Sequence, residues 1–204
     1  MNDGFLKLSE DRQQEIVNAG FKVFAQNPYK KAPAAEIASE AGISKALLFY
    51  HFKNKKELYL YLWEKALSLI TNELSRQQVF DTKDYFEMLS RSLRAKCNVM
   101  RKYPYMMEFS LRAYYEKAPE VVNDIRGSFD QVNQESQLKA LDKMDRRGFL
   151  DGIDFSLMYQ EMVWSADGYM RNALMMEEID PDKIEHDFDR LISQWKKVYL
   201  KREV

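Results

Sequence analysis

The residues from Asn54 to Tyr103 contain neither glycine nor proline. An uninterrupted stretch of this length favours long helices over strands joined by tight turns, because these two residue types mark most turns and helix ends. The chain of 204 residues has only 7 glycines and 5 prolines, with 46% hydrophobic and 31% charged residues. This composition is typical of an ordered protein, and we expect an all-α fold of about nine helices without a sheet.

Composition also narrows the class of protein. Cys97 is the only cysteine, which excludes an internal disulfide and favours a reducing cytoplasm. No apolar run reaches the length of about 18 residues needed to cross a membrane. The net charge of -1 means that any nucleic-acid site has to be local. The two histidines, His51 and His186, are far apart, and there is no glycine-rich phosphate loop or metal-ligand cluster, so we expect no enzyme, cofactor or metal.

Helix-capping residues divide the N-terminal part into short helices. Ser9 precedes a helix that runs to about Asn27, and Pro33 opens the next one. Gly42 stands where a left-handed residue ends a helix, and Ser44 can cap a third helix that ends near Phe52. The later helices are expected after Asn54, Pro104, Pro119, the loop at Gly148 and Gly152, and Asp180. Two short helices joined by a tight turn therefore meet near residues 34–52.

The third helix has a core face and an apolar excess. Helical spacing places Leu48 and Phe52 on one side, where Ile43 from the turn can join them. The residues that point elsewhere are Ala46, Leu47, Phe49, Tyr50 and Lys53. Such a short helix cannot bury all of its apolar and aromatic side chains, which leaves a surface for a partner. The alternative is that Phe49 and Tyr50 pack on a neighbouring helix.

The same segment is locally basic. Between Ser44 and Lys56 the charged residues are Lys45, Lys53, Lys55 and Lys56, with His51 among them and no acid. Lys55 and Lys56 lie at the start of the helix that follows Asn54, whose free N–H groups can hold a phosphate oxygen. The pattern is consistent with a phosphate-binding surface, and equally with an ordinary solvated face.

A family resemblance favours the first interpretation. The run from 34 to 58, with EIA at 36–38, AGISK at 41–45, LFYHF at 48–52 and KKEL at 55–58, closely resembles the TetR family of bacterial regulators. The resemblance implies a helix-turn-helix whose third helix enters the DNA major groove, with Lys45, Ala46 and Leu47 reading base edges. It places Tyr50, His51 and Lys55 at phosphates, and we include Ser44, Phe49 and Lys53 in the DNA-binding set.

Three positions depart from the family pattern. Ala46 stands where glycine is frequent, Phe49 where tyrosine is frequent, and Pro33 where a threonine often caps the second helix. Two hydroxyl contacts to phosphate are therefore expected to be missing. These departures bear on affinity and operator choice rather than on DNA binding itself.

Two domains are expected, a DNA-binding domain at 1–56 and a helical effector-binding and dimerisation domain at 57–204. The last two helices carry more apolar residues than one subunit can cover, so we expect a two-fold dimer that can address a pseudo-palindromic operator. The predicted interface comprises Trp164, Met170, Leu174, Phe188, Leu191, Ile192, Trp195 and Tyr199.

An aromatic and methionine-rich set lies between these two regions. Its members are Trp63, Cys97, Met100, Tyr103, Met107, Tyr114 and Trp164, and they are candidates for a pocket that binds an apolar or aromatic effector. For any one of them, a position in the plain core is the favoured explanation. The sequence thus predicts a dimeric DNA-binding regulator, by family default a repressor, that an effector releases. The competing hypothesis is a helical architectural or interaction protein that binds DNA without an effector.

Overall fold

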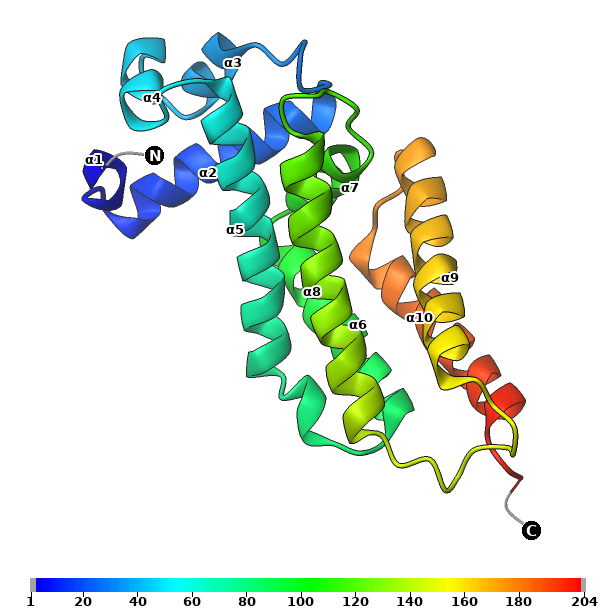
Figure 1. Ribbon diagram of the computed structural model, residues 1–204. Coiled ribbons are helices and arrows are strands. Elements are labelled where there is room, and N and C mark those ends of the chain that lie inside the picture. Colours follow the sequence, from blue (N-terminus) through cyan, green and yellow to red (C-terminus); the bar gives the residue numbers. More distant parts are fainter. Residues whose placement is uncertain (1–2, 203–204) are drawn as a thin grey trace. The chain divides into compact units, whose positions relative to one another are not determined.

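The computed structural model describes residues 3–202, and these form α-helices connected by short loops (Figure 1). The helices are α1 (Asp3–Leu6), α2 (Glu10–Gln26), α3 (Ala34–Glu40), α4 (Lys45–His51), α5 (Lys55–Arg76), α6 (Tyr85–Lys102), α7 (Met106–Tyr114), α8 (Val122–Lys143), α9 (Phe155–Met175) and α10 (Pro181–Tyr199), with a 3-10 turn η1 (Val79–Asp81). Among the described residues the only β pairing is the single bridge between Phe149 and Leu200. The expected all-α fold is confirmed, with one short helix, α1, that the sequence reading did not anticipate.

Most helix starts follow the predicted capping signals. The Ser9 side chain accepts a hydrogen bond from the Arg12 N–H, and the Asn54 side chain accepts one from Glu57. Asp180 caps α10 in the same way, with Pro181 as its first residue. These caps satisfy N–H groups that have no partner within their helices.

Two compact units make up the described chain, and each is treated by itself. The first unit contains residues 3–68 and 103–129, and the second contains residues 69–102 and 130–202. Both α5 and α8 run from one unit into the other. The predicted boundary after residue 56 stays a prediction.

The core of the first unit is an aromatic cluster. Tyr59 lies 4.7 Å from Phe24 and 5.2 Å from Phe109 between ring centroids, which joins α5, α2 and α7. Tyr29, in the loop after α2, packs against Tyr59 at 4.9 Å. The rings meet at steep angles, the edge-to-face arrangement that aromatic quadrupoles favour. Burial raises the pKa of Tyr59 above its ordinary value.

Helix α2 approaches α5 closely at Gly20. A Cβ atom at that position would lie 2.6 Å from the Leu62 Cδ1 atom, a distance that real Cβ contacts do not show. The absence of a side chain at Gly20 therefore lets the two helices pack at short range.

The second unit has its own core, centred on α6 and α10. Tyr85, Phe86 and Met162 are buried there together with Trp195. The Tyr85 hydroxyl lies 3.5 Å from the Met162 sulfur, and burial raises the pKa of this tyrosine. A backbone hydrogen bond holds the end of α10 to the loop before α9, where the Leu150 N–H donates to the Tyr199 C=O at 2.9 Å.

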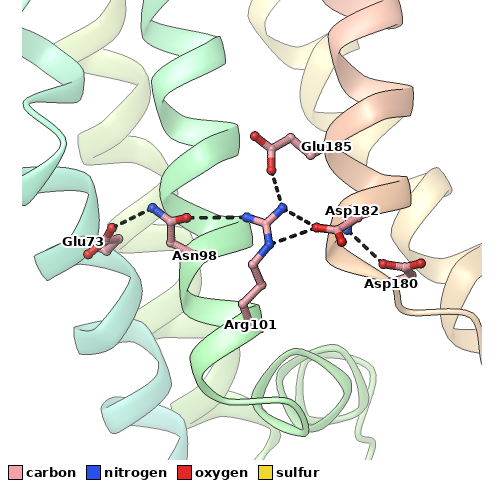
Figure 2. Close-up of polar contacts among 6 residues, drawn as sticks. All are labelled: Glu73, Asn98, Arg101, Asp180, Asp182 and Glu185. Carbon is pink, nitrogen blue, oxygen red and sulfur yellow. Dashed lines mark hydrogen bonds and ion pairs between the residues drawn. The ribbon is translucent and has the colours of Figure 1, made fainter.

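A polar network ties α10 to α6 near the end of α6 (Figure 2). The Arg101 guanidinium lies 2.6 Å from carboxylate oxygens of both Asp182 and Glu185, and these two acids raise the pKa of Arg101. On the other side, the Asn98 amide donates to Glu73 of α5 at 3.2 Å. Hydrogen bonds, chiefly from Arg76, lower the pKa of Glu73 to about 2. The network therefore connects α5, α6 and α10 through charged groups and the neutral Asn98 amide.

Candidate DNA interface

The turn between α3 and α4 is built from local capping. Gly42 has a φ of +61°, the left-handed conformation that glycine adopts without strain. The Ser44 side chain caps α4 by accepting a hydrogen bond from the Leu47 N–H at 3.1 Å. The Arg12 guanidinium of α2 donates to the Gly42 carbonyl at 3.0 Å, which fixes the turn against the first long helix. The predicted helix-turn-helix is present, with α4 as its second helix (Figure 1).

Helix α4 has one buried and one exposed face. Leu48 and Phe52 are fully buried, as predicted, while Ile43 is half-buried. Lys45 and Ala46 are exposed. The large apolar side chains on the outer face are exposed as well, with Leu47 at 40% and Tyr50 at 64%. Tyr50 therefore does not pack into the core, whereas Phe49 is half-buried.

Lys45 and Phe49 lie one turn apart and contact each other. The Lys45 ammonium sits 5.9 Å from the centre of the Phe49 ring, within the range of a cation–π contact. At the other end of α4, Lys53 is exposed and lies 3.7 Å from the Glu57 carboxylate. Lys45 on α4 and Lys53 in the turn after it can both reach an anion in front of α4, because long side chains turn freely at the surface.

His51 differs from its predicted place at a phosphate. Its side chain is only 3% exposed, and neither ring nitrogen has a hydrogen-bond partner. Phe5 of α1 covers it with a ring contact at 5.8 Å, and Phe5 also packs on Phe52 at 4.8 Å. Burial lowers the pKa of His51 from its ordinary value. In this structure the imidazole is part of the core beneath α1.

Lys55 also points inward. Its ammonium donates to the Lys30 carbonyl at 2.9 Å and to the Ala32 carbonyl at 3.3 Å, and it lies 5.2 Å from the centre of the Tyr29 ring. These contacts hold the loop between α2 and α3 against the start of α5. Two of the three N–H donors of the ammonium are thus used inside the protein.

The predicted effector residues fall into both units. In the first unit, Trp63 and Tyr103 are buried and Met107 and Tyr114 are half-buried. The Trp63 indole donates to the Ser128 hydroxyl at 2.7 Å. Tyr103 lines a pocket of about 330 Å³ together with residues of α2 and α3. In the second unit, Cys97 and Met100 are buried and Trp164 is exposed.

Burial also divides the predicted dimer residues. Phe188, Ile192 and Trp195 are buried within the second unit, where Phe188 contacts Tyr169 at 5.0 Å between ring centroids. Met170, Leu174, Leu191 and Tyr199 are half-buried. Trp164 is 60% exposed. The predicted interface set does not include the other large exposed side chains of this region, Leu157, Met175, Met176 and Val198. Helical spacing identifies an apolar stripe, but it does not separate the chain's own core from its outer face.

Comparison with protein families bears on the same segment. Residues 16–62, which contain α3, α4 and the start of α5, match the N-terminal domain of the bacterial regulatory proteins of the tetR family. This segment belongs to the TetR family. The family match therefore covers the helix-turn-helix whose geometry is described above.

Similar proteins extend the likeness beyond the matched segment. The HTH-type transcriptional activator FasR of Mycolicibacterium smegmatis is 27% identical over 141 residues, which is 64% of this chain and 63% of FasR. The chain thus spans less than two thirds of that relative. A TetR-family regulator from Chloroflexus aurantiacus shares the fold with a TM-score of 0.65 at 19% identity, covering 98% of this chain and 99% of its own.

A third relative was solved with a ligand. FadR from Bacillus subtilis, determined in complex with stearoyl-CoA, has a TM-score of 0.60 and 16% identity, and the match covers 85% of this chain and 95% of FadR. None of the helices within residues 3–202 has the length and apolar character of a membrane span.

Proposed function

We propose that this chain is a DNA-binding transcriptional regulator that inserts α4 into the major groove. The observation that carries the proposal is the outer face of α4, where Lys45, Ala46, Leu47 and Tyr50 are exposed on a helix anchored by Leu48. Ala46 and Leu47 can contact thymine methyl groups, and Lys45 can donate to guanine. Tyr50, Lys53 and the N-cap Ser44 are suited to phosphates.

The proposed regulator acts as a homodimer. Leu157, Trp164 and Met175 are exposed at 55%, 60% and 73% and lie on one face of α9, because their spacings of 7 and 18 residues bring the helix back to nearly the same direction. Large exposed apolar side chains aligned along one helix face indicate an interaction surface. We propose that a second copy of the chain covers this face of α9. A two-fold dimer presents two α4 helices, which can bind the two half-sites of a pseudo-palindromic operator.

The experiment that tests both parts is selection of bound sequences from random duplex DNA. The expected result is an inverted repeat with two half-sites. A single uninterrupted site, or no enrichment at low salt, contradicts the proposal. A Leu47→Ala variant should change the preferred bases, because Leu47 is placed to read them, whereas Lys53→Gln should weaken binding on all sequences.

Dimerisation is tested separately at Trp164. Trp164→Glu should shift the protein from dimer to monomer in sedimentation, since it places a charge in the proposed interface. Leu138→Glu is the matched control, because Leu138 is 62% exposed on α8 and lies outside that face. A wild-type monomer, or the same shift in both variants, refutes this interface.

We further propose an apolar effector that releases the regulator from its operator and so relieves repression. The ligand of FadR, stearoyl-CoA, supports a long-chain acyl group as the first compound to test. Stearoyl-CoA at micromolar concentration should raise the melting temperature and lower DNA affinity, because a ligand that favours one conformation shifts the population toward it. DNA affinity that no apolar ligand changes would favour the architectural DNA-binding protein instead. FasR carries the name of an activator, and a promoter fusion determines the direction of control.

A further inference from the structure

A row of acidic residues runs from the end of α7 into the first turn of α8. Glu116, Glu120 and Asp124 are spaced four residues apart. The Glu116 carboxylate accepts a hydrogen bond from the Tyr29 N–H at 3.0 Å. All of these residues belong to the first unit, so the acidic row lies against the same body that contains α4.

The other two acids contact Lys30 and Lys56, which stand before and after the helix-turn-helix in the sequence. Glu120 lies 3.9 Å from the Lys30 ammonium, and Asp124 lies 3.3 Å from the Lys56 ammonium. Lys30 is in the loop after α2, and Lys56 is the second residue of α5, which directly follows α4. The Lys55 ammonium donates to the Lys30 carbonyl and so holds the loop after α2 against the start of α5. Lys30 and Lys56 therefore belong to the same part of the structure.

Lys56, the lysine paired with Asp124, lies in the first turn of α5. The first turn of a helix presents unpaired N–H groups and a positive partial charge, so an anion is favoured there and a lone cation is not. In this structure the first turn contains the acid Glu57, and the Lys56 ammonium is itself paired with the Asp124 carboxylate. In a DNA complex a backbone phosphate is the anion expected at the start of α5. The carboxylate and the phosphate thus compete for the same ammonium group.

We propose that the start of α8 is an autoinhibitory contact in which Asp124, supported by Glu120, withholds Lys56 and Lys30 from DNA phosphates. This inference rests on the proposed DNA-binding function. It provides a way for the helical part of the chain to set DNA affinity without touching α4. A movement of α8 away from α5 frees the lysines and strengthens binding, and a movement toward α5 weakens it.

Both Lys56 and Asp124 side chains are about half exposed, at 45% and 55%, so the pair exchanges readily with solvent ions. Asp124→Asn should therefore tighten binding to a random duplex by about 1.5- to 5-fold at low salt, the range expected for an exposed ion pair. The plot of log affinity against log salt should become steeper by up to about 0.9, the contribution of one additional phosphate contact. Fluorescence anisotropy with a labelled duplex measures both quantities.

Two variants separate this contact from general charge effects. Asp130→Asn makes the same charge change on α8 at an exposed aspartate, and it should leave both affinity and salt slope close to wild type. In a Lys56→Gln background, Asp124→Asn should no longer change affinity, because the ammonium for which the two anions compete is absent. Unfolding temperatures should show that all variants fold.

The results distinguish the inference from the proposed function. If wild type does not bind duplex DNA at low salt, the proposed function fails, and the competition fails with it. If wild type binds but Asp124→Asn leaves the affinity and the slope unchanged, only the autoinhibitory contact is overturned. The same follows if Asp130→Asn tightens binding equally, or if the effect of Asp124→Asn persists without Lys56.

Discussion

Replacing His51 by phenylalanine should remove a pH dependence from the stability of this protein. His51 is 3% exposed, and both ring nitrogens lack a partner, so the folded chain holds a neutral imidazole where an imidazolium would be costly. No acid contributes to its pKa shift, and burial alone lowers it. The position of His51 in the last turn of α4 favours a positive charge, but burial outweighs this effect because no acceptor is within reach.

The size of the effect follows from proton linkage. Because the pKa of the folded state lies below the ordinary value of 6.5, the unfolded chain binds a proton first as the pH falls. The contribution of the neutral imidazole is fully present above pH 6.5 and is lost below it, by at most about 1.4 kcal/mol for each pH unit. Glu73 contributes mainly at lower pH, because its stabilising effect is lost between the ordinary glutamate pKa of 4.5 and its folded pKa of about 2.

Urea denaturation followed by circular dichroism at pH 7.5, 6.5 and 5.5 measures the free energy of unfolding. Wild type should lose more stability between pH 7.5 and 5.5 than His51→Phe, and the difference should be at most about 1.4 kcal/mol. His186→Gln, at an exposed histidine, is the control and should behave as wild type. Equal pH dependence in wild type and His51→Phe would refute the reasoning. A wild type that gains stability relative to His51→Phe as the pH falls to 5.5 would refute it too.

Two further substitutions test contacts of the first unit. Lys55→Met should destabilise the protein by about 1–3 kcal/mol in the same urea assay, because two carbonyls lose a charged donor, and should weaken DNA binding on every sequence. The salt slope of DNA binding should stay as in wild type, and a decrease of about 0.9 would show instead that Lys55 contacts a phosphate. Gly20→Ala should also destabilise, by about 1–3 kcal/mol, since the added Cβ meets Leu62, although alanine favours helices. A Leu62→Val background should reduce that loss, and an unchanged loss would mean that the Cβ contact is not its cause.

Local signals allowed most of the helix-turn-helix to be predicted from sequence. Capping by Ser9, Ser44 and Asn54, and the left-handed Gly42, are effects within three residues, and all four are found in the structure. The buried positions of Leu48 and Phe52 follow from the period of the helix. These features depend on neighbours in the sequence, which explains why the sequence alone was sufficient.

Long-range contacts determined what the sequence reading missed. His51 is buried by Phe5, a residue 46 positions away on a helix too short for its pattern to predict. From the sequence, Lys55 looks like another surface cation. Only the structure shows that its ammonium donates to the carbonyls of Lys30 and Ala32. In α10, the stripe predicted as interface contains Phe188, Ile192 and Trp195, which face the chain's own core. Helical periodicity predicts the direction in which a side chain points, but it does not identify the residue or the chain that the side chain contacts.

The Arg101 network has a geometric consequence for the proposed dimer face. A helix that slides by one residue along its neighbour moves its side chains about 1.5 Å, and Arg101 holds carboxylates from positions 182 and 185 at once (Figure 2). A slide in either direction lengthens at least one of these contacts, so the network fixes the axial register of α10 on α6. Tyr169 of α9 donates to Asp187 of α10, which extends that register to α9. In the proposed dimer, the axial position of the side chains on the outer face of α9 is thus set within each subunit, before two copies associate.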